Sequence, residues 1–227
     1  MPKSRAIHKV TNVIVGVLLA ICLIAIMATA LIEEAPHEYL GIALFALMVA
    51  HVVLNRRWFA ALGRGRWSPG RVLQTVVIAA LVVCMVGQVA SAVVLSKHAL
   101  GFLPAITGAS WARGVHMVCS YWSFVLAFAH VGLQVKPMCA KLHLLRDAKP
   151  SALWALRVLW LIVAAAGVFS FAQMGLGDYL IARVQFAAAD HGSAFVMRMA
   201  KFASVGVLVA GLFHYANVAL GALRRTS

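Results

Sequence analysis

Acidic side chains are scarce in this chain: its 227 residues include six Asp and Glu against twenty Lys and Arg. Only 11% of the residues are charged and 63% are hydrophobic, whereas charged residues make up about a quarter of an ordinary soluble domain. So few acidic groups cannot solvate the surface of a soluble protein of this length. Lipid is the solvent that suits the composition, because it removes the need for a polar exterior.

Cysteine motifs are also missing. The four cysteines, Cys22, Cys84, Cys119 and Cys139, are isolated, and no CxxC occurs. A zinc ribbon and a c-type haem attachment both depend on such a motif, so we expect neither of them, and no disulfide framework. There is no GxGxxG at a strand–helix junction either, which leaves no nicotinamide- or flavin-binding domain in the chain.

The net charge of +14 would suit a nucleic-acid partner. The Lys and Arg residues, however, cluster in short segments between apolar runs, as the topology of a membrane protein predicts. No RNA- or DNA-binding motif accompanies them, so we expect no nucleic-acid partner.

Six apolar segments are long enough to cross a bilayer, which takes about 20 mainly apolar residues. The sequence therefore predicts an all-α, integral membrane bundle of six helices that forms one domain over residues 1–227. The first run is followed by acidic residues and not by a small-residue cleavage site, so we expect a retained helix and no signal peptide. The six predicted spans are 11–32, 37–55, 71–95, 112–134, 154–174 and 194–221.

Basic residues gather at both termini and in the second and fourth connections, whereas the first connection is acidic, with Glu33, Glu34 and Glu38. Positive charge stays on the cytoplasmic side of a membrane protein. We therefore expect both termini in the cytoplasm and a multi-pass protein of the bacterial cytoplasmic (inner) membrane, surrounded by membrane lipid. The third and fifth connections are partly apolar, and we expect short helices there along the outer interface.

Four histidines form a pattern in the second and fourth spans. His37 and His51 are 14 residues apart, as are His116 and His130. Fourteen residues of α-helix return to within about 40° of the same face and rise about 21 Å. The two spans run in the same direction, so His37 and His116 should share an outer level, and His51 and His130 an inner one. We expect these two spans at the centre of the bundle.

Two imidazoles from neighbouring helices can fill both axial positions of a haem iron, which favours electron transfer over ligand binding. We therefore predict two haems b between the second and fourth spans. His37 and His116 would bind the outer iron, and His51 and His130 the inner iron. The alternatives are another metal, since imidazole also suits zinc and copper, or histidines that only hydrogen-bond to neighbouring helices.

The two histidine spans also resemble each other. Residues 37–57 read HEYLGIALFALMVAHVVLNRR and residues 116–136 read HMVCSYWSFVLAFAHVGLQVK, which share F-x-L-x-x-A-H-V-x-L. We interpret this as a tandem duplication of a two-helix unit, over about 37–95 and 116–174. Each unit would give one ligand to each haem.

The stretch HEYLGIALFALMVAHVVLNRRWFAAL resembles the signature of the flavinylation-associated di-haem membrane cytochromes b, long grouped as a domain of unknown function. It is similar, more loosely, to ferric-reductase-like cytochromes. In the second unit Gln134 replaces the Asn of the motif and the Trp is absent. The resemblance implies a haem conduit that exchanges electrons with an extracytoplasmic redox partner, often a protein that carries covalently bound flavin. The matching positions are His37, Gly41, His51, Asn55 and Trp58.

His214 lies in the sixth span near the inner level, where it would either line a quinone or proton site or serve only in packing. No general acid–base pair marks a catalytic site, so we expect an electron-transfer subunit and not a stand-alone enzyme. Two alternatives stay open. One is a quinol, superoxide or metal oxidoreductase that acts alone at the membrane face, and the other is a transporter or structural subunit without haem.

Overall fold

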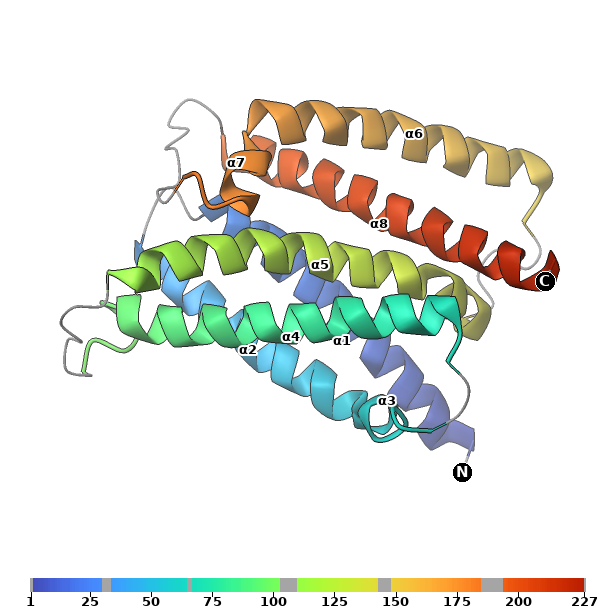
Figure 1. Ribbon diagram of the computed structural model, residues 1–227, viewed down its shortest axis with the longest axis horizontal. Helices are drawn as coiled ribbons and strands as arrows, with labels where there is room; N and C mark the ends of the chain where they lie inside the picture. Colours follow the sequence, from blue (N-terminus) through green and yellow to red (C-terminus); the bar gives the residue numbers. More distant parts are fainter. Residues whose placement is uncertain are drawn as a thin grey trace.

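The computed structural model describes residues 2–29, 34–64, 67–102, 110–142, 148–184 and 194–226. All regular secondary structure within these ranges is helical (Figure 1). Six of the helices are long and apolar enough to cross a membrane, as the sequence predicted. They are α1 (Pro2–Thr29), α2 (Glu34–Leu54), α4 (Pro69–Leu95), α5 (Trp111–Leu142), α6 (Pro150–Gln173) and α8 (Phe195–Thr226).

Most of these helices begin or end within a few residues of the predicted limits. α1 and α5 differ most: α1 begins at Pro2, nine residues before the predicted limit, and α5 continues past residue 134 through Pro137 to Leu142. In both, backbone hydrogen bonding extends the helix beyond the end of its apolar run. The fifth connection contains the short helix α7 (Leu176–Leu180), as predicted, and the second contains an unpredicted one, α3 (Arg56–Ala60). In the third connection, residues 97–102 form bends and turns and no helix. The remaining residues of this connection where a short helix was expected, 103–109, lie outside the described residues.

Local sequence signals explain where several helices begin. Ser68 accepts a hydrogen bond from the backbone N–H of Arg71 at 3.3 Å, and Pro69 follows it in the first turn of α4. A serine cap followed by proline favours a helix start, because the cap satisfies a free N–H and proline has none to satisfy. Pro150 likewise stands in the first turn of α6, where its missing N–H leaves no donor to satisfy. Gly175, with a φ of +60°, makes the left-handed turn between α6 and α7.

α5 lies at the centre of the bundle, between α4 and α8, while α6 packs on α8 and α1 packs on both α2 and α8 (Figure 1). The ring of Phe124 lies 5.0 Å from that of Phe128 and 5.5 Å from that of Phe202, in the buried core between α5 and α8. Glycine lets these two helices approach closely, because a Cβ on Gly132 would collide with the backbone of Ala210. Small residues at such crossings are typical of membrane helices.

α2 stands at the edge of the bundle, so the expectation that both histidine spans lie at its centre was wrong for this helix. None of its residues is fully buried, and none of its Cα atoms lies within 8 Å of a Cα atom of α4 or α5. Among the described helices, it packs only against α1 and the adjoining α3. Directly packed helices have axes about 8–10 Å apart, so α2 is separated from α5 by more than an ordinary helix contact.

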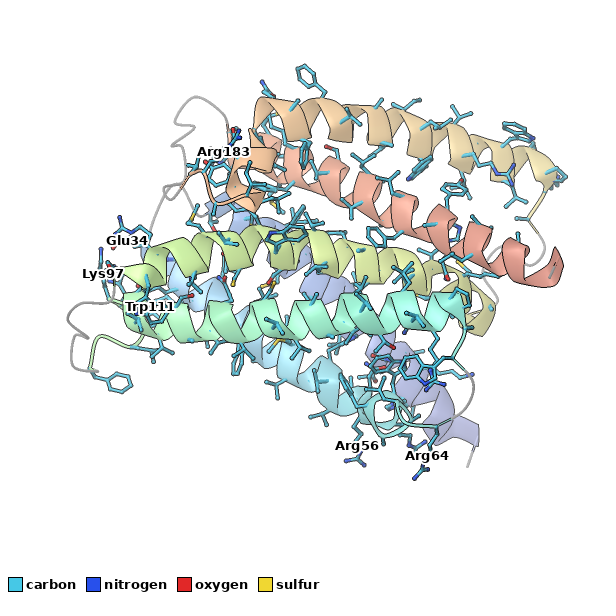
Figure 2. The ribbon with its side chains drawn as sticks, viewed as in Figure 1. Glu34, Arg56, Arg64, Lys97, Trp111 and Arg183 are labelled. Atoms are coloured by element: carbon cyan, nitrogen blue, oxygen red, sulfur yellow. The ribbon has the colours of Figure 1, made fainter. Side chains whose placement is uncertain are left out.

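Charged residues mark the two ends of the bundle (Figure 2). Glu34 and Lys97 lie at one end, near Trp111, while Arg56 and Arg64 lie at the other. Both chain termini are at the same end as Arg56 and Arg64 (Figure 1). We call these the Glu34 end and the terminal end. The two termini and the basic second connection therefore share one end, as the charge pattern indicated.

Candidate functional site

The structure brings the four histidines of the sequence pattern together in two pairs. The rings of His37 and His116 have centroids 6.1 Å apart and planes at 63° to each other. The rings of His51 and His130 have centroids 6.3 Å apart and planes at 90°. The first pair lies toward the Glu34 end and the second toward the terminal end. In both cases the imidazole rings of α2 and α5 meet although no Cα atoms of the two helices lie within 8 Å of each other.

The ring spacing of both pairs suits a shared metal ion. Two imidazoles that bind one metal from opposite sides through bonds of about 2 Å have ring centroids about 6 Å apart. A tilted contact between two bare rings gives a similar distance. Metal binding and ring packing differ in what they predict for the ring nitrogens. If the rings only packed against each other, a buried nitrogen without a hydrogen-bond partner would be destabilising.

Three of the four imidazoles have such a nitrogen: Nδ1 of His37, of His51 and of His130 is buried and has no hydrogen-bond partner among the described residues. Leaving a buried polar atom unpaired costs about 1–3 kcal/mol, and such atoms are uncommon in folded proteins. Histidines that served only to join helices would use these nitrogens. An imidazole nitrogen without a hydrogen-bond partner can instead bind a metal ion or a haem iron.

His116 differs from the other three because polar residues of α4 surround it. Gln88 Nε2 lies 3.1 Å from Nε2 of His116, and the Ser91 hydroxyl lies 3.3 Å from its Nδ1. Ser91 donates its own proton to the Gly87 carbonyl at 2.7 Å, so its oxygen can accept a hydrogen bond from Nδ1–H. Ser120 in turn donates to Oε1 of Gln88 at 3.0 Å. With the proton on Nδ1, Nε2 of His116 carries the lone pair and accepts a hydrogen bond from the Gln88 amide. This hydrogen bond would have to break before Nε2 could bind a metal.

A carboxylate ties α2 to the end of α4 at the Glu34 end. Glu38, the residue after His37, accepts a hydrogen bond from the Ser96 hydroxyl at 2.7 Å. It also accepts three backbone N–H groups at 2.7–3.0 Å from the residues that follow α4. This contact fixes the distance between the start of α2 and the end of α4, and so helps to hold His37 in place. The three N–H donors belong to Lys97, His98 and Ala99.

At the terminal end, α2 is tied to α1, and α3 to α4. Asn55, which follows α2, exchanges two side-chain hydrogen bonds of 2.9 Å with Asn12 of α1 and donates a third to the His51 carbonyl at 2.8 Å. Arg71 of α4 donates to three carbonyl oxygens of residues 61–64, just after α3, at 2.7–3.0 Å. Both ends of α2 are therefore held while its length stays apart from α4 and α5.

Other residues singled out in the sequence have different surroundings. The ring of His214, on α8, lies 5.3 Å from that of Tyr215 and lines a cavity with residues of α5 and α6. Gly41 faces α1, where an added Cβ would lie 3.6 Å from Cδ1 of Ile26. That is an ordinary packing distance, so contact between α1 and α2 accounts for this small residue.

No protein-family model, curated protein or solved structure matches this chain. The likeness to the flavinylation-associated cytochromes stays a hypothesis from the sequence motif.

The number of ligands at each pair limits which metal could bind. In the described parts of the chain, no three His, Cys, Asp or Glu side chains gather at one point. A structural zinc site takes four protein ligands and a catalytic zinc site takes three, so neither pair suffices for zinc. A haem iron needs only two ligands from the protein, because the macrocycle supplies the others. Two imidazoles alone thus suit haem better than a bare metal ion.

Several residues that position the pairs were not predicted from the sequence. Ser91 is a polar residue within an apolar run, and such residues inside spans are usually functional, so a signal for it existed. Asn12 follows Thr11 near the predicted start of the first span, where a polar residue is not unusual. Glu38 was interpreted only as part of an acidic connection. Its partners lie 58 to 61 residues away along the chain, and no local pattern shows a contact of that kind.

Glu38→Ala is expected to destabilise the protein, because it leaves backbone N–H groups at the end of α4 without an acceptor. Removing one partner of hydrogen bonds to a charged group costs about 1–3 kcal/mol, so the midpoint of thermal unfolding in detergent should fall. Glu34→Ala is the matched control. Glu34 lies one turn earlier and pairs with the exposed Lys97 at 2.8 Å, and exposed ion pairs contribute little. Equal falls in both variants would contradict the role of Glu38.

Proposed function

We propose that this chain is a membrane cytochrome b that transfers electrons through two haems held between α2 and α5. His37 and His116 would bind one iron, and His51 and His130 the other. The observation that carries the proposal is the geometry of the two histidine pairs, which recur at two levels of the same two helices with ring centroids 6.1 and 6.3 Å apart. The unpaired buried nitrogens support it.

The residues of the chain would bind and orient the ligands. A haem held by two imidazoles exchanges single electrons and leaves no open position for a substrate. The Ser91 hydroxyl would accept a hydrogen bond from Nδ1–H of His116. This bond fixes the orientation of the ring and makes Nε2 of His116 a stronger ligand for the iron. The Gln88 amide would turn its N–H from His116 to the Ser120 hydroxyl, whose own proton can be donated to the His116 carbonyl oxygen at 2.7 Å. Glu38 and Asn55 would hold α2 at the separation that the two pairs require.

The charge pattern predicts how the protein is oriented in the membrane. Positive charge favours the cytoplasmic side, so the terminal end would face the cytoplasm of a bacterial cell. The pair His37 and His116 would then lie near the outer face of the cytoplasmic (inner) membrane. The haem at that level would exchange electrons with an extracytoplasmic redox protein, and the sequence motif favours one that carries flavin.

Haem content and spectrum test the proposal. Protein produced with ample haem and purified in detergent should give a b-type difference spectrum between its reduced and oxidised states, with about two haems per chain. A variant with Ala at all four histidines should be colourless while its circular dichroism remains helical. A wild-type preparation that is folded but colourless would refute the proposal.

Two other functions have less support. A quinol, superoxide or metal oxidoreductase acting alone would turn over without a partner protein, so steady turnover by the isolated chain would favour it. A transporter usually carries acidic groups deep in its spans. Here the six acidic residues lie in connections or near span ends, at positions 33, 34, 38, 147, 178 and 190.

A further inference from the structure

A cavity of about 200 Å³ opens between α5, α6 and α8. Val135 of α5 contributes to its wall five residues after His130, so the cavity lies about 7.5 Å along the axis from that level. The lining is mostly apolar with a few polar groups, the usual character of a small-molecule site. Its walls include Val135, Trp160, Val207, Gly211, His214 and Tyr215.

Three rings line this cavity. The centroid of the Tyr215 ring lies 5.2 Å from that of Trp160 and 5.3 Å from that of His214. The indole N–H of Trp160 donates to the Val207 carbonyl at 3.3 Å, and Gly211 has no side chain to collide with the indole. The Trp160 ring is therefore fixed as a wall, and its one donor is already used.

His214 and Tyr215 supply the polar groups that remain. Among the described residues, no hydrogen bond involves a ring nitrogen of His214 or the hydroxyl of Tyr215. Tyr215 is 47% exposed and Val207 is 37% exposed, on a helix that spans the membrane. A ligand would therefore enter from the lipid, and it would offer oxygen atoms to these donors.

We propose that this cavity binds the ring of a lipid-soluble quinone, with His214 donating a hydrogen bond to one of its carbonyl oxygens. A flat, apolar ring fits between aromatic walls, and a cavity of about 150 Å³ already holds a benzene ring. The long apolar tail of such a molecule would lie along the exposed surface of α8. Binding itself requires no haem, whereas its part in electron transfer rests on the proposed function.

Binding can be measured on the full chain in lipid nanodiscs, with a decyl-substituted benzoquinone as the probe and quenching of tryptophan fluorescence as the signal. We expect a saturable component that disappears in Trp160→Phe. His214→Leu should weaken binding by about tenfold, as the loss of one good hydrogen bond does. His214→Gln keeps a donor and should restore most of the affinity.

A matched pair of valines tests the place of binding. Val207→Phe should fill the cavity and weaken binding by about tenfold or more, while Val218→Phe changes an exposed valine of the same helix outside the cavity and should have no effect. Equal responses of the two variants, or no saturable quenching, would overturn the proposal. So would equal displacement of the probe by decanol, which would show a groove for alkyl chains.

Haem content, measured in the same samples, keeps this proposal separate from the previous one. Quinone binding to a colourless chain would refute the cytochrome and leave the cavity as a quinone site. Two haems without saturable quinone binding would refute the cavity and leave the cytochrome.

Discussion

His130→Ala is expected to remove one of the two proposed haems and leave the other in place. His51→Ala should do the same, because the two side chains form one pair with ring centroids 6.3 Å apart. Among the described residues, no third His, Cys, Asp or Glu gathers with either pair that could replace a lost ligand. The haem content should fall from about two to about one per chain, as a pyridine haemochrome assay would measure.

Double variants test whether each haem belongs to one pair. His51→Ala with His130→Ala should lose no more haem than either single change, because both residues act on one site. His37→Ala with His130→Ala should lose both haems, because effects at separate sites add. The two levels are about 21 Å apart along the helices. If His37→Ala and His130→Ala removed the same component of a redox titration, the pairing would be wrong.

Histidines outside the pairs provide the controls. His98 is an exposed residue near Glu34, with 46% of its side chain accessible, and His214 lines the cavity between α5, α6 and α8. Replacing either by Ala should leave about two haems per chain. Loss of haem in both controls would mean that general destabilisation, and not loss of a ligand, explains the main result.

The histidine pairs were predictable because their arrangement depends on little more than helix geometry. A 14-residue spacing puts His37 and His51 on one face, and the same spacing in the fourth span puts His116 and His130 on another. The two spans share a direction, so matching positions share a level. The six long helices were predictable for a similar reason, since each needs only a sufficient apolar run.

The position of α2 could not be predicted, because it depends on contacts between distant polar residues. Periodicity tells which residues share a face, but not which neighbour that face meets. α2 stays apart from α5 because Glu38 binds residues just after α4 and Asn55 binds Asn12 of α1, across 43 to 61 residues of sequence. The short helix α3 was missed because five residues give no measurable period.

Electron transfer across a lipid bilayer is expected to stop when either histidine pair is broken. The chain would be reconstituted into vesicles that enclose ferricyanide, and dithionite would be added outside. Wild-type protein should bleach the enclosed ferricyanide at a rate that rises with the amount of protein per vesicle. His37→Ala and His51→Ala should each slow this by about tenfold or more, because one remaining haem cannot bridge about 30 Å of hydrocarbon.

The design does not depend on how the protein inserts, because electrons would pass the two haems in series from either side. Vesicles that contain the variant with Ala at all four histidines measure leakage of the reagents. Glu34→Ala keeps both pairs and should match the wild-type rate. His214→Phe should match it too, because dithionite supplies electrons without a quinone. If a variant with one broken pair bleached the ferricyanide as fast as wild type, electrons would not need to pass both levels. The two haems of the wild-type protein would then serve separate reactions at the two faces of the membrane.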